Sequence, residues 1–318
     1  MPSLIVRKIL DRIGQSDLVS KLGESLSGTE LNSLLLEVLR QQTLKCSAPQ
    51  LLKHYQANRF VKPAEIDVLR LKRIELDLLN IFKESSFDPL ELSPVTVLGA
   101  CSVIALADQN KILSALRGTE VLADATNAIA LHISDLKKRK AWNPSTPGEQ
   151  IRFATIQRHV RTQTVAGKGF TPHFKIGCLV SAGLDTGSFS FEKTSLLEHV
   201  QMMQRIFLDY YHVEQLSFRF LCRKGYADPL RLAKDVTEFI AQHLPEIVLE
   251  IVESPDKEIA YYTGLQYKVD ITVKGTTYEI GDGGFVDWTQ QLLQNKKERF
   301  LITGFGFEIM YRIMHEWS

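Results

Sequence analysis

Cysteine is scarce in this sequence, and the few cysteines that it has form no recognisable pattern. The 318 residues include Cys46, Cys101, Cys178 and Cys222, far apart and without any CxxC pair. The eight histidines are equally scattered. Zinc sites in proteins show short Cys or His spacings, so no metal site is predicted. Reduced, buried thiols are expected instead, which is typical of a cytoplasmic protein.

The sequence also lacks an excess of either charge and a long hydrophobic run. Its 38 basic and 37 acidic residues leave a net charge of +1. A dedicated nucleic-acid binder normally carries a clear basic excess, so binding of free tRNA is not expected. The longest uncharged stretch, residues 92–107, contains Pro94 and Gly99 and is shorter than a membrane span. The N-terminus lacks the long apolar stretch of a signal peptide, and no membrane association is predicted.

The first part of the chain has the apolar spacing of helices. Residues 28–42 (GTELNSLLLEVLRQQ) and 62–85 (KPAEIDVLRLKRIELDLLNIFKES) place apolar side chains on one helical face. The segment SSFDPLELSP, residues 85–94, interrupts that pattern. We therefore predict a helical N-terminal region over residues 1–85 and a second domain over residues 86–318.

Beyond residue 94, short β-prone runs alternate with helices and turn signals. One such run is residues 120–133 (EVLADATNAIALHI), which we interpret as β-prone. Lys274-Gly275 separates two further runs and predicts a tight hairpin. Consecutive strands joined by a hairpin are antiparallel, so the pattern favours an α+β domain over a doubly wound parallel sheet.

Four segments of this second domain contain residues suited to ligand binding. Residues 159–177 (HVRTQTVAGKGFTPHFKIG) read as a strand with Arg161, a glycine-containing loop and a return strand. An arginine on such a hairpin can bind phosphate through a planar fork, or it can be an ordinary surface residue. The other segments are residues 261–271 (YYTGLQYKVDI), 281–288 (GDGGFVDW) and 302–317 (ITGFGFEIMYRIMHEW).

The tyrosine segment alternates strictly after its first four residues. Leu265 and Tyr267 fall on one face and Gln266 and Lys268 on the other, as in a half-buried strand. Its two leading tyrosines either line a pocket or belong to the core. The glycines of the last two segments allow close approach of a ligand to the backbone, or they mark turns.

Taken together and in this order, the four segments resemble the catalytic core of class II aminoacyl-tRNA synthetases, and most closely that of histidyl-tRNA synthetase. That family has an Arg-x-Glu hairpin, a Tyr-Tyr-Thr-Gly strand, a Gly-Gly-Gly-Arg-Tyr-Asp segment and a Gly-Phe-Ala-Ile-Gly-x-Glu-Arg strand and helix. The resemblance extends from Pro94 to the C-terminus and includes neither the N-terminal helices nor the family's anticodon-binding domain. It implies an antiparallel sheet flanked by helices, and a homodimer formed around Pro94.

The resemblance also implies roles for individual residues. Arg161 would hold the ATP α-phosphate and the reacting carboxylate, and Lys257 would replace a second catalytic arginine. The residues implied in ATP binding are Arg161, Gln163, His173, Phe174, Gly304, Gly306 and Arg312. Those implied in substrate binding are Lys175, Tyr261, Tyr262, Gly264, Gly283 and Gly284. ATP and Mg²⁺ are the implied cofactors.

Several residues depart from the family's pattern. Gln163 replaces a glutamate, and in a gap-free register His173 takes the place of the aromatic residue that stacks on adenine. The arginine of the last motif is missing, and Arg312 follows one position later, about 100° around a helix.

The substrate pocket differs as well. Lys175 and Lys257 lie where the family has a glutamine and an arginine, and the family's acidic residue falls near Ser134. These lysines predict a small ligand that is more anionic than histidine.

Two functions fit this pattern, and whether the protein is an enzyme stays open. One is a non-translational paralogue with a degraded ATP site that binds a ligand or acts as the regulatory subunit of a partner enzyme. The regulatory subunit of ATP phosphoribosyltransferase is a precedent for it. The alternative is an ATP-dependent ligase that activates a small carboxylic acid as an acyl-adenylate. A true tRNA synthetase is a third and weaker interpretation.

Overall fold

The computed structural model describes residues 3–317, apart from residues 143–145, 147, 164–170 and 254–259. The helices are α1 (Leu4–Ile13), α2 (Leu18–Glu24), α3 (Gly28–Leu44), α4 (Ala48–Ala57), α5 (Val68–Glu84), α6 (Ala125–Lys138), α7 (Ser190–Gln204), α8 (Pro229–His243), α9 (Trp288–Leu293) and α10 (Phe307–Arg312). Short helical turns are η1 (Arg59–Val61), η2 (Ala100–Ile104), η3 (Gln109–Lys111), η4 (Arg205–Tyr210) and η5 (Ile313–Trp317).

Eight strands form the central sheet, in the order β1-β5-β6-β11-β10-β9-β7-β8. They are β1 (Asp88–Pro89), β5 (Ile151–Val160), β6 (His173–Leu184), β7 (Gln215–Cys222), β8 (Val248–Val252), β9 (Leu265–Val273), β10 (Thr276–Val286) and β11 (Glu298–Phe305). Only the two outermost pairs, β1–β5 and β7–β8, are parallel. A small antiparallel sheet contains β2 (Val95–Val97), β4 (Thr119–Val121) and β3 (Ser114–Ala115).

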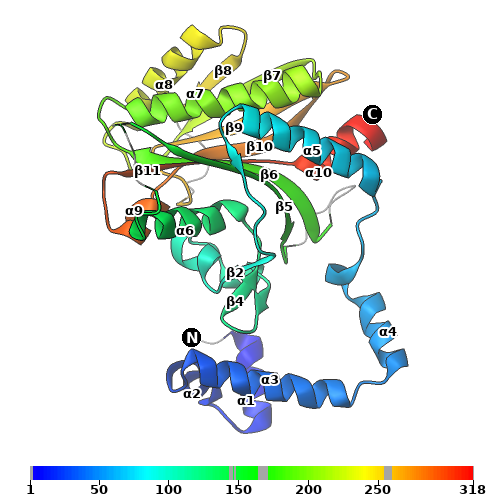
Figure 1. The fold of residues 1–318 in the computed structure, drawn as a ribbon. Coiled ribbons are helices and arrows are strands. Elements are labelled where there is room, and N and C mark those ends of the chain that lie inside the picture. The colour runs from blue at the N-terminus through cyan, green and yellow to red at the C-terminus, as the bar shows by residue number, and fades with distance from the viewer. Residues whose placement is uncertain (1–2, 143–145, 147, 164–170, 254–259, 318) are drawn as a thin grey trace.

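Helices cover both faces of the central sheet (Figure 1). The larger core lies under α5, α7 and α8, where Leu78, Leu196 and Val236 are fully buried. A smaller core lies on the opposite face, under α6 and α9. A sheet buried on both faces needs apolar side chains in both directions along each central strand.

The β9–β10 hairpin confirms the antiparallel prediction. Val273 pairs with Thr276, and Lys274 and Gly275 between them have φ values of 49° and 73°. Positive φ at both central residues matches the right-handed twist of the flanking strands. Leu265, Tyr267, Val269 and Ile271 all pack in the larger core, as their alternation predicts.

The N-terminal helices differ in how they pack. Helix α5 buries Leu71, Leu78 and Phe82 in the larger core, although it precedes residue 86. The segment before it, residues 4–61, carries many exposed apolar side chains and lies beside the core (Figure 1); we call it the N-terminal arm. Examples are Leu4, Ile5, Ile9, Ile13, Leu35, Leu39, Leu51 and Leu52.

The structure of residues 120–133 differs from the β-prone run that the sequence predicted. Only Glu120 and Val121 of this run lie in a strand, β4, and α6 begins at Ala125. Asp124 is the N-cap of α6, and its carboxylate accepts the backbone N–H of Thr126 at 2.9 Å. Ile129 and Ile133 then face the smaller core at helical spacing. Among the helices that the structure describes, none has the length and apolar character to cross a membrane.

Candidate functional site

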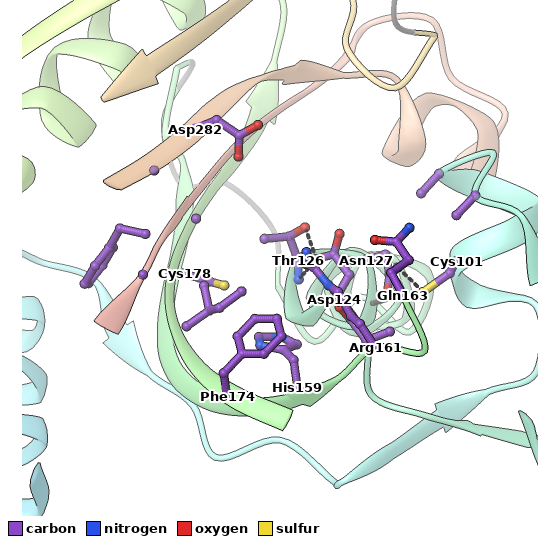
Figure 2. Close-up of a pocket in the computed structure, with 18 of the residues that line it drawn as sticks. Cys101, Asp124, Thr126, Asn127, His159, Arg161, Gln163, Phe174, Cys178 and Asp282 are labelled. Carbon is purple, nitrogen blue, oxygen red and sulfur yellow. Dashed lines mark hydrogen bonds between the residues drawn. The ribbon is translucent and has the colours of Figure 1, made fainter. Parts of the chain in front are cut away.

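A cavity of about 800 Å³ opens on the face of the sheet that carries α6. Its walls come from β5, β6, β9, β10 and β11, from the start of α6, and from the segments around Lys111 and Tyr261. Figure 2 shows Asp124, Thr126 and Asn127 together at the start of α6. Of the predicted site residues, those that line the cavity are Arg161, Gln163, Phe174, Lys175, Tyr261, Tyr262, Gly304 and Gly306.

Arg161 follows the last residue of β5 and extends along the cavity wall. Its Nε donates to the carbonyl of Ala123 at 3.1 Å, which fixes the guanidinium beside the start of α6. The guanidinium carbon lies 5.5 Å from the centre of the Phe174 ring. Within the described part of the chain, its terminal nitrogens have no hydrogen-bond or ion-pair partner, so they can bind an anion.

Of the neighbouring residues His173 and Phe174, Phe174 lines the cavity, beside Tyr261, Tyr262 and Phe305. His173 contributes nothing to the cavity. Its Nε2 lies 2.6 Å from the carbonyl oxygen of Lys62, and its Nδ1 lies 2.9 Å from an Arg158 nitrogen. Successive side chains of a strand point to opposite faces of a sheet. Of these two residues, the structure therefore brings only the Phe174 side chain to the cavity.

The same alternation removes the Lys175 side chain from the site. Its Nζ lies 2.6 Å from both carboxylate oxygens of Glu75 in α5, on the other face of the sheet. Burial lowers the pKa of this ammonium, and the hydrogen bonds that it donates to Glu75 oppose that effect. Lys175 is therefore a structural cation and does not support the prediction of an anionic ligand. Lys257, the other basis of that prediction, lies outside the described residues.

Asp124 is a cavity residue that the sequence interpretation missed. The Tyr261 hydroxyl donates to one of its oxygens at 2.5 Å, and the Thr126 hydroxyl donates to the other at 2.7 Å. Burial acts to raise the pKa of Asp124, but these hydrogen bonds and the charge of Arg161 outweigh it, so its pKa lies below the usual value. Ser134, which the resemblance aligned with the family's acidic residue, is buried in α6 and does not line the cavity.

His159 and Asn127 add two polar atoms that have no partner among the described residues. The His159 Nε2 accepts the backbone N–H of Ala125 at 2.9 Å, which places the ring proton on Nδ1. Burial lowers the pKa of His159 to about 4, so the ring is neutral at pH 7. Its Nδ1 and the Asn127 Oδ1 are buried without a hydrogen bond. A bound ligand that offers one acceptor and one donor would satisfy both.

Arg312 does not reach the cavity. Its guanidinium lies 2.7 Å from the Glu316 carboxylate and 3.1 Å from the Glu65 carbonyl, and Glu308 lies 3.6 Å away. The arginine is buried in these contacts, with a side-chain exposure of 9%. Its expected role in binding ATP is therefore not supported by its position.

The glycines also separate into two groups. Gly304 and Gly306 line the cavity, whereas Gly264, Gly283 and Gly284 do not. A Cβ on Gly283 would lie 2.4 Å from the Tyr267 hydroxyl, so this glycine is needed for packing of the sheet. Among the residues that the structure describes, no cluster of His, Cys, Asp or Glu could hold a metal ion.

Comparison with known proteins shows the fold. No family model and no curated protein matches the sequence. The apo histidyl-tRNA synthetase of S. aureus superposes with a TM-score of 0.61 at 13% identity, over 82% of this chain and 70% of that chain. A protein from Bacillus halodurans C, named as an ATP phosphoribosyltransferase regulatory subunit/histidyl-tRNA synthetase, has a TM-score of 0.61 at 12% identity, over 81% and 83% of the two chains.

A histidine–tRNA ligase subunit from Alicyclobacillus acidocaldarius has a TM-score of 0.54 at 13% identity, and the match covers 98% of that chain and 82% of this one. These similarities confirm the predicted α+β fold of a class II aminoacyl-tRNA synthetase core.

Proposed function

We propose that this chain is a non-translational paralogue of histidyl-tRNA synthetase that binds a small ligand and acts as a regulatory or partner subunit. Its fold is that of the synthetase core, and its cavity occupies the face where α6 begins. The B. halodurans protein, whose name includes a regulatory subunit, has the same fold and supports this assignment.

The main support for the proposal is that the last of the four segments, residues 302–317, lacks the family's arginine. Tyr311 stands where the resemblance requires an arginine, and it is buried with 3% exposure. The next residue, Arg312, is held by Glu308 and Glu316 outside the cavity. A triphosphate needs cationic or metal partners for its charge, and this motif supplies none. We therefore propose that the ATP site is degraded.

The charges around the cavity favour a small anionic ligand. Arg59, Lys111, Arg161 and Lys268 line it together with Asp124 and Asp282. His159 is neutral at pH 7 because its pKa is lowered to about 4. Among the described lining residues whose side chains face the cavity, cations therefore exceed carboxylates by two. This excess replaces Lys175 as the basis for expecting an anion.

Pyrophosphate exchange tests the proposal directly. The full chain would be incubated with ATP, labelled pyrophosphate, Mg²⁺ and each of the protein amino acids. For a regulatory subunit, we expect no more incorporation of labelled pyrophosphate into ATP than in a protein-free control. Exchange that depends on an amino acid, and that is lost in Arg161→Ala, would contradict the proposal.

The alternative is an ATP-dependent ligase with Mg·ATP as cofactor. It is favoured by one observation, namely that Arg161 lies in the cavity beside Phe174 with its terminal nitrogens unengaged by described residues. Such an arginine can orient a phosphate against a carboxylate, supplying position and charge rather than covalent chemistry. Exchange that depends on a carboxylic acid other than an amino acid would favour this alternative.

A homodimer is part of the proposal. The segment that corresponds to the family's dimer motif exposes a group of apolar side chains, namely Val95, Val97, Leu98, Val103 and Leu106. Isologous dimers bury apolar surface of this kind against the same surface of a second copy. Sedimentation velocity should therefore give a dimer for the natural chain and a monomer for Val97→Asp. A monomeric natural chain would contradict this part.

A further inference from the structure

Three cationic residues from separate parts of the chain line the same cavity. Arg59 comes from η1 in the N-terminal arm, Lys111 from η3, and Arg161 from the end of β5. We call these three the rim cations. Neither Arg59 nor Lys111 belongs to the synthetase motifs, because one precedes them in the arm and the other lies between the expected dimer segment and α6.

Backbone contacts around Thr162 bring the rim cations together. The Arg59 guanidinium donates to the carbonyl of Thr162. The N–H of Thr162 donates to the carbonyl of Lys111 at 3.2 Å, and its hydroxyl donates to the carbonyl of Asn110 at 3.2 Å. Since Thr162 follows Arg161 directly, these contacts hold η1 and η3 against the strand end that carries Arg161.

The rim cations have no carboxylate partner of their own within the described residues. None of the three forms an ion pair there, whereas Lys268, the other cation facing the cavity, lies 2.9 Å from Glu279 and 3.5 Å from Asp282. The Arg59 guanidinium lies over the Phe60 ring at 4.4 Å, which keeps its edge accessible. The charge of Arg161 lowers the pKa of nearby Asp124, but three like charges around one cavity still repel one another, and a bound anion would offset that repulsion.

We propose that the rim cations bind a phosphoryl or polyphosphate group of the ligand. This inference rests on the proposed ligand-binding function and specifies the chemistry of that ligand. Two guanidinium groups and an ammonium suit phosphate oxygens, because each arginine can donate two parallel hydrogen bonds. A phosphoryl group also carries the two negative charges that the cavity lacks. Because Arg59 belongs to the arm, the bound anion links the arm to the core.

Calorimetric titration of the full chain with inorganic pyrophosphate, and separately with Mg·ATP, tests whether the rim cations bind phosphate. The loss of a charge-assisted hydrogen bond at a partly exposed site weakens binding by about tenfold. Arg59→Ala is therefore expected to raise the dissociation constant by about that factor, and Lys111→Ala should raise it too. Arg40→Ala is the matched control, because Arg40 lies in the same arm and pairs with Glu37 away from the cavity.

Hydrogen exchange tests the link to the arm in the same samples. Pyrophosphate should slow exchange of the amides around η1 in the natural chain and in Arg40→Ala, but not in Arg59→Ala. This readout does not depend on any catalytic activity. It also separates a lost contact from a misfolded variant, because the exchange pattern of the central sheet should stay unchanged.

The two probes distinguish the source of the phosphate. Equal affinity for pyrophosphate and Mg·ATP would indicate a small phosphorylated ligand, and much tighter binding of Mg·ATP would indicate a nucleotide; either supports the rim site. Absence of binding of both probes by the folded chain would overturn the inference, as would equal affinities of Arg59→Ala and Arg40→Ala. A different result would contradict the proposed function, namely pyrophosphate exchange that requires Arg161. The outcomes of the two experiments can therefore be told apart.

Discussion

The buried ion pair between Lys175 and Glu75 provides a quantitative test of which face of the sheet Lys175 occupies. The two side chains are 10% and 8% exposed, and the ammonium lies 2.6 Å from both carboxylate oxygens. Glu75→Gln keeps the shape of this side chain and removes its charge. The Lys175 ammonium then stays buried without a counterion. Removing one partner of a buried pair typically costs about 3–5 kcal/mol.

Urea denaturation followed by circular dichroism at pH 7 measures this cost. An exposed ion pair serves as the control, because Lys83 and Asp88 are 68% and 61% exposed. Asp88→Asn should change the free energy of unfolding by less than about 1 kcal/mol. The double variant Glu75→Leu, Lys175→Met should recover most of the stability lost in Glu75→Gln, because packed apolar residues can replace a buried pair.

Two results would refute this reasoning. One is a Glu75→Gln variant as stable as the Asp88→Asn control, which would mean that Lys175 is not buried against α5. The other is a folded Glu75→Leu, Lys175→Met variant that loses affinity for pyrophosphate, which would return Lys175 to the ligand site.

Two further predictions concern packing and pH. Gly177→Ala would place a Cβ 2.1 Å from the Phe305 ring, which is buried and packs against Phe207. We therefore expect a loss of about 1–3 kcal/mol in the free energy of unfolding and a lower melting temperature. Burial lowers the pKa of His199 from 6.5 to about 3. The unfolded chain therefore binds the extra proton first as pH falls below about 6.5, and stability decreases by about 1.4 kcal/mol per pH unit from this group. His199→Gln should remove that part of the slope in urea titrations between pH 6 and 4, and an unchanged slope would contradict the burial of a neutral ring.

The sequence predicts the architecture of the sheet better than the details of the cavity. The alternation after Tyr262 and the Lys274-Gly275 turn predict the β9–β10 hairpin, because both depend on local backbone geometry. The order of the four segments indicates the synthetase fold. In that fold Arg161 and Tyr261 line the same cavity. These features depend on local patterns and on their order, which a single sequence contains.

The register of β6 depends on the loop before it, which a gap-free comparison cannot place. A shift by one residue moves every side chain of a strand to the opposite face. His173, Phe174 and Lys175 were all assigned to the site, whereas among these three the structure places the side chain of Phe174 in the cavity and directs the other two to Lys62 and Glu75. The pairing of Lys175 with Glu75 joins residues far apart in the chain, and no local pattern indicates it.

Asp124 was missed although the sequence contains a signal for it. An aspartate followed two residues later by a threonine, before Ile129 and Ile133 at helical spacing, is typical of a helix start. The apolar residues around it suggested a strand instead. The contribution of Arg59 from the N-terminal arm had no such signal, because it depends on contacts with Thr162 in another part of the chain.

Pyrophosphate exchange by the full chain tests the central claim most directly. We propose a ligand-binding paralogue whose last motif offers no cation to the nucleotide, because Arg312 is held by Glu308 and Glu316. We expect no exchange above a protein-free control with any amino acid or with a mixture of small carboxylic acids. Exchange that depends on one of these acids and disappears in Arg161→Ala would contradict the account and establish an adenylate-forming enzyme.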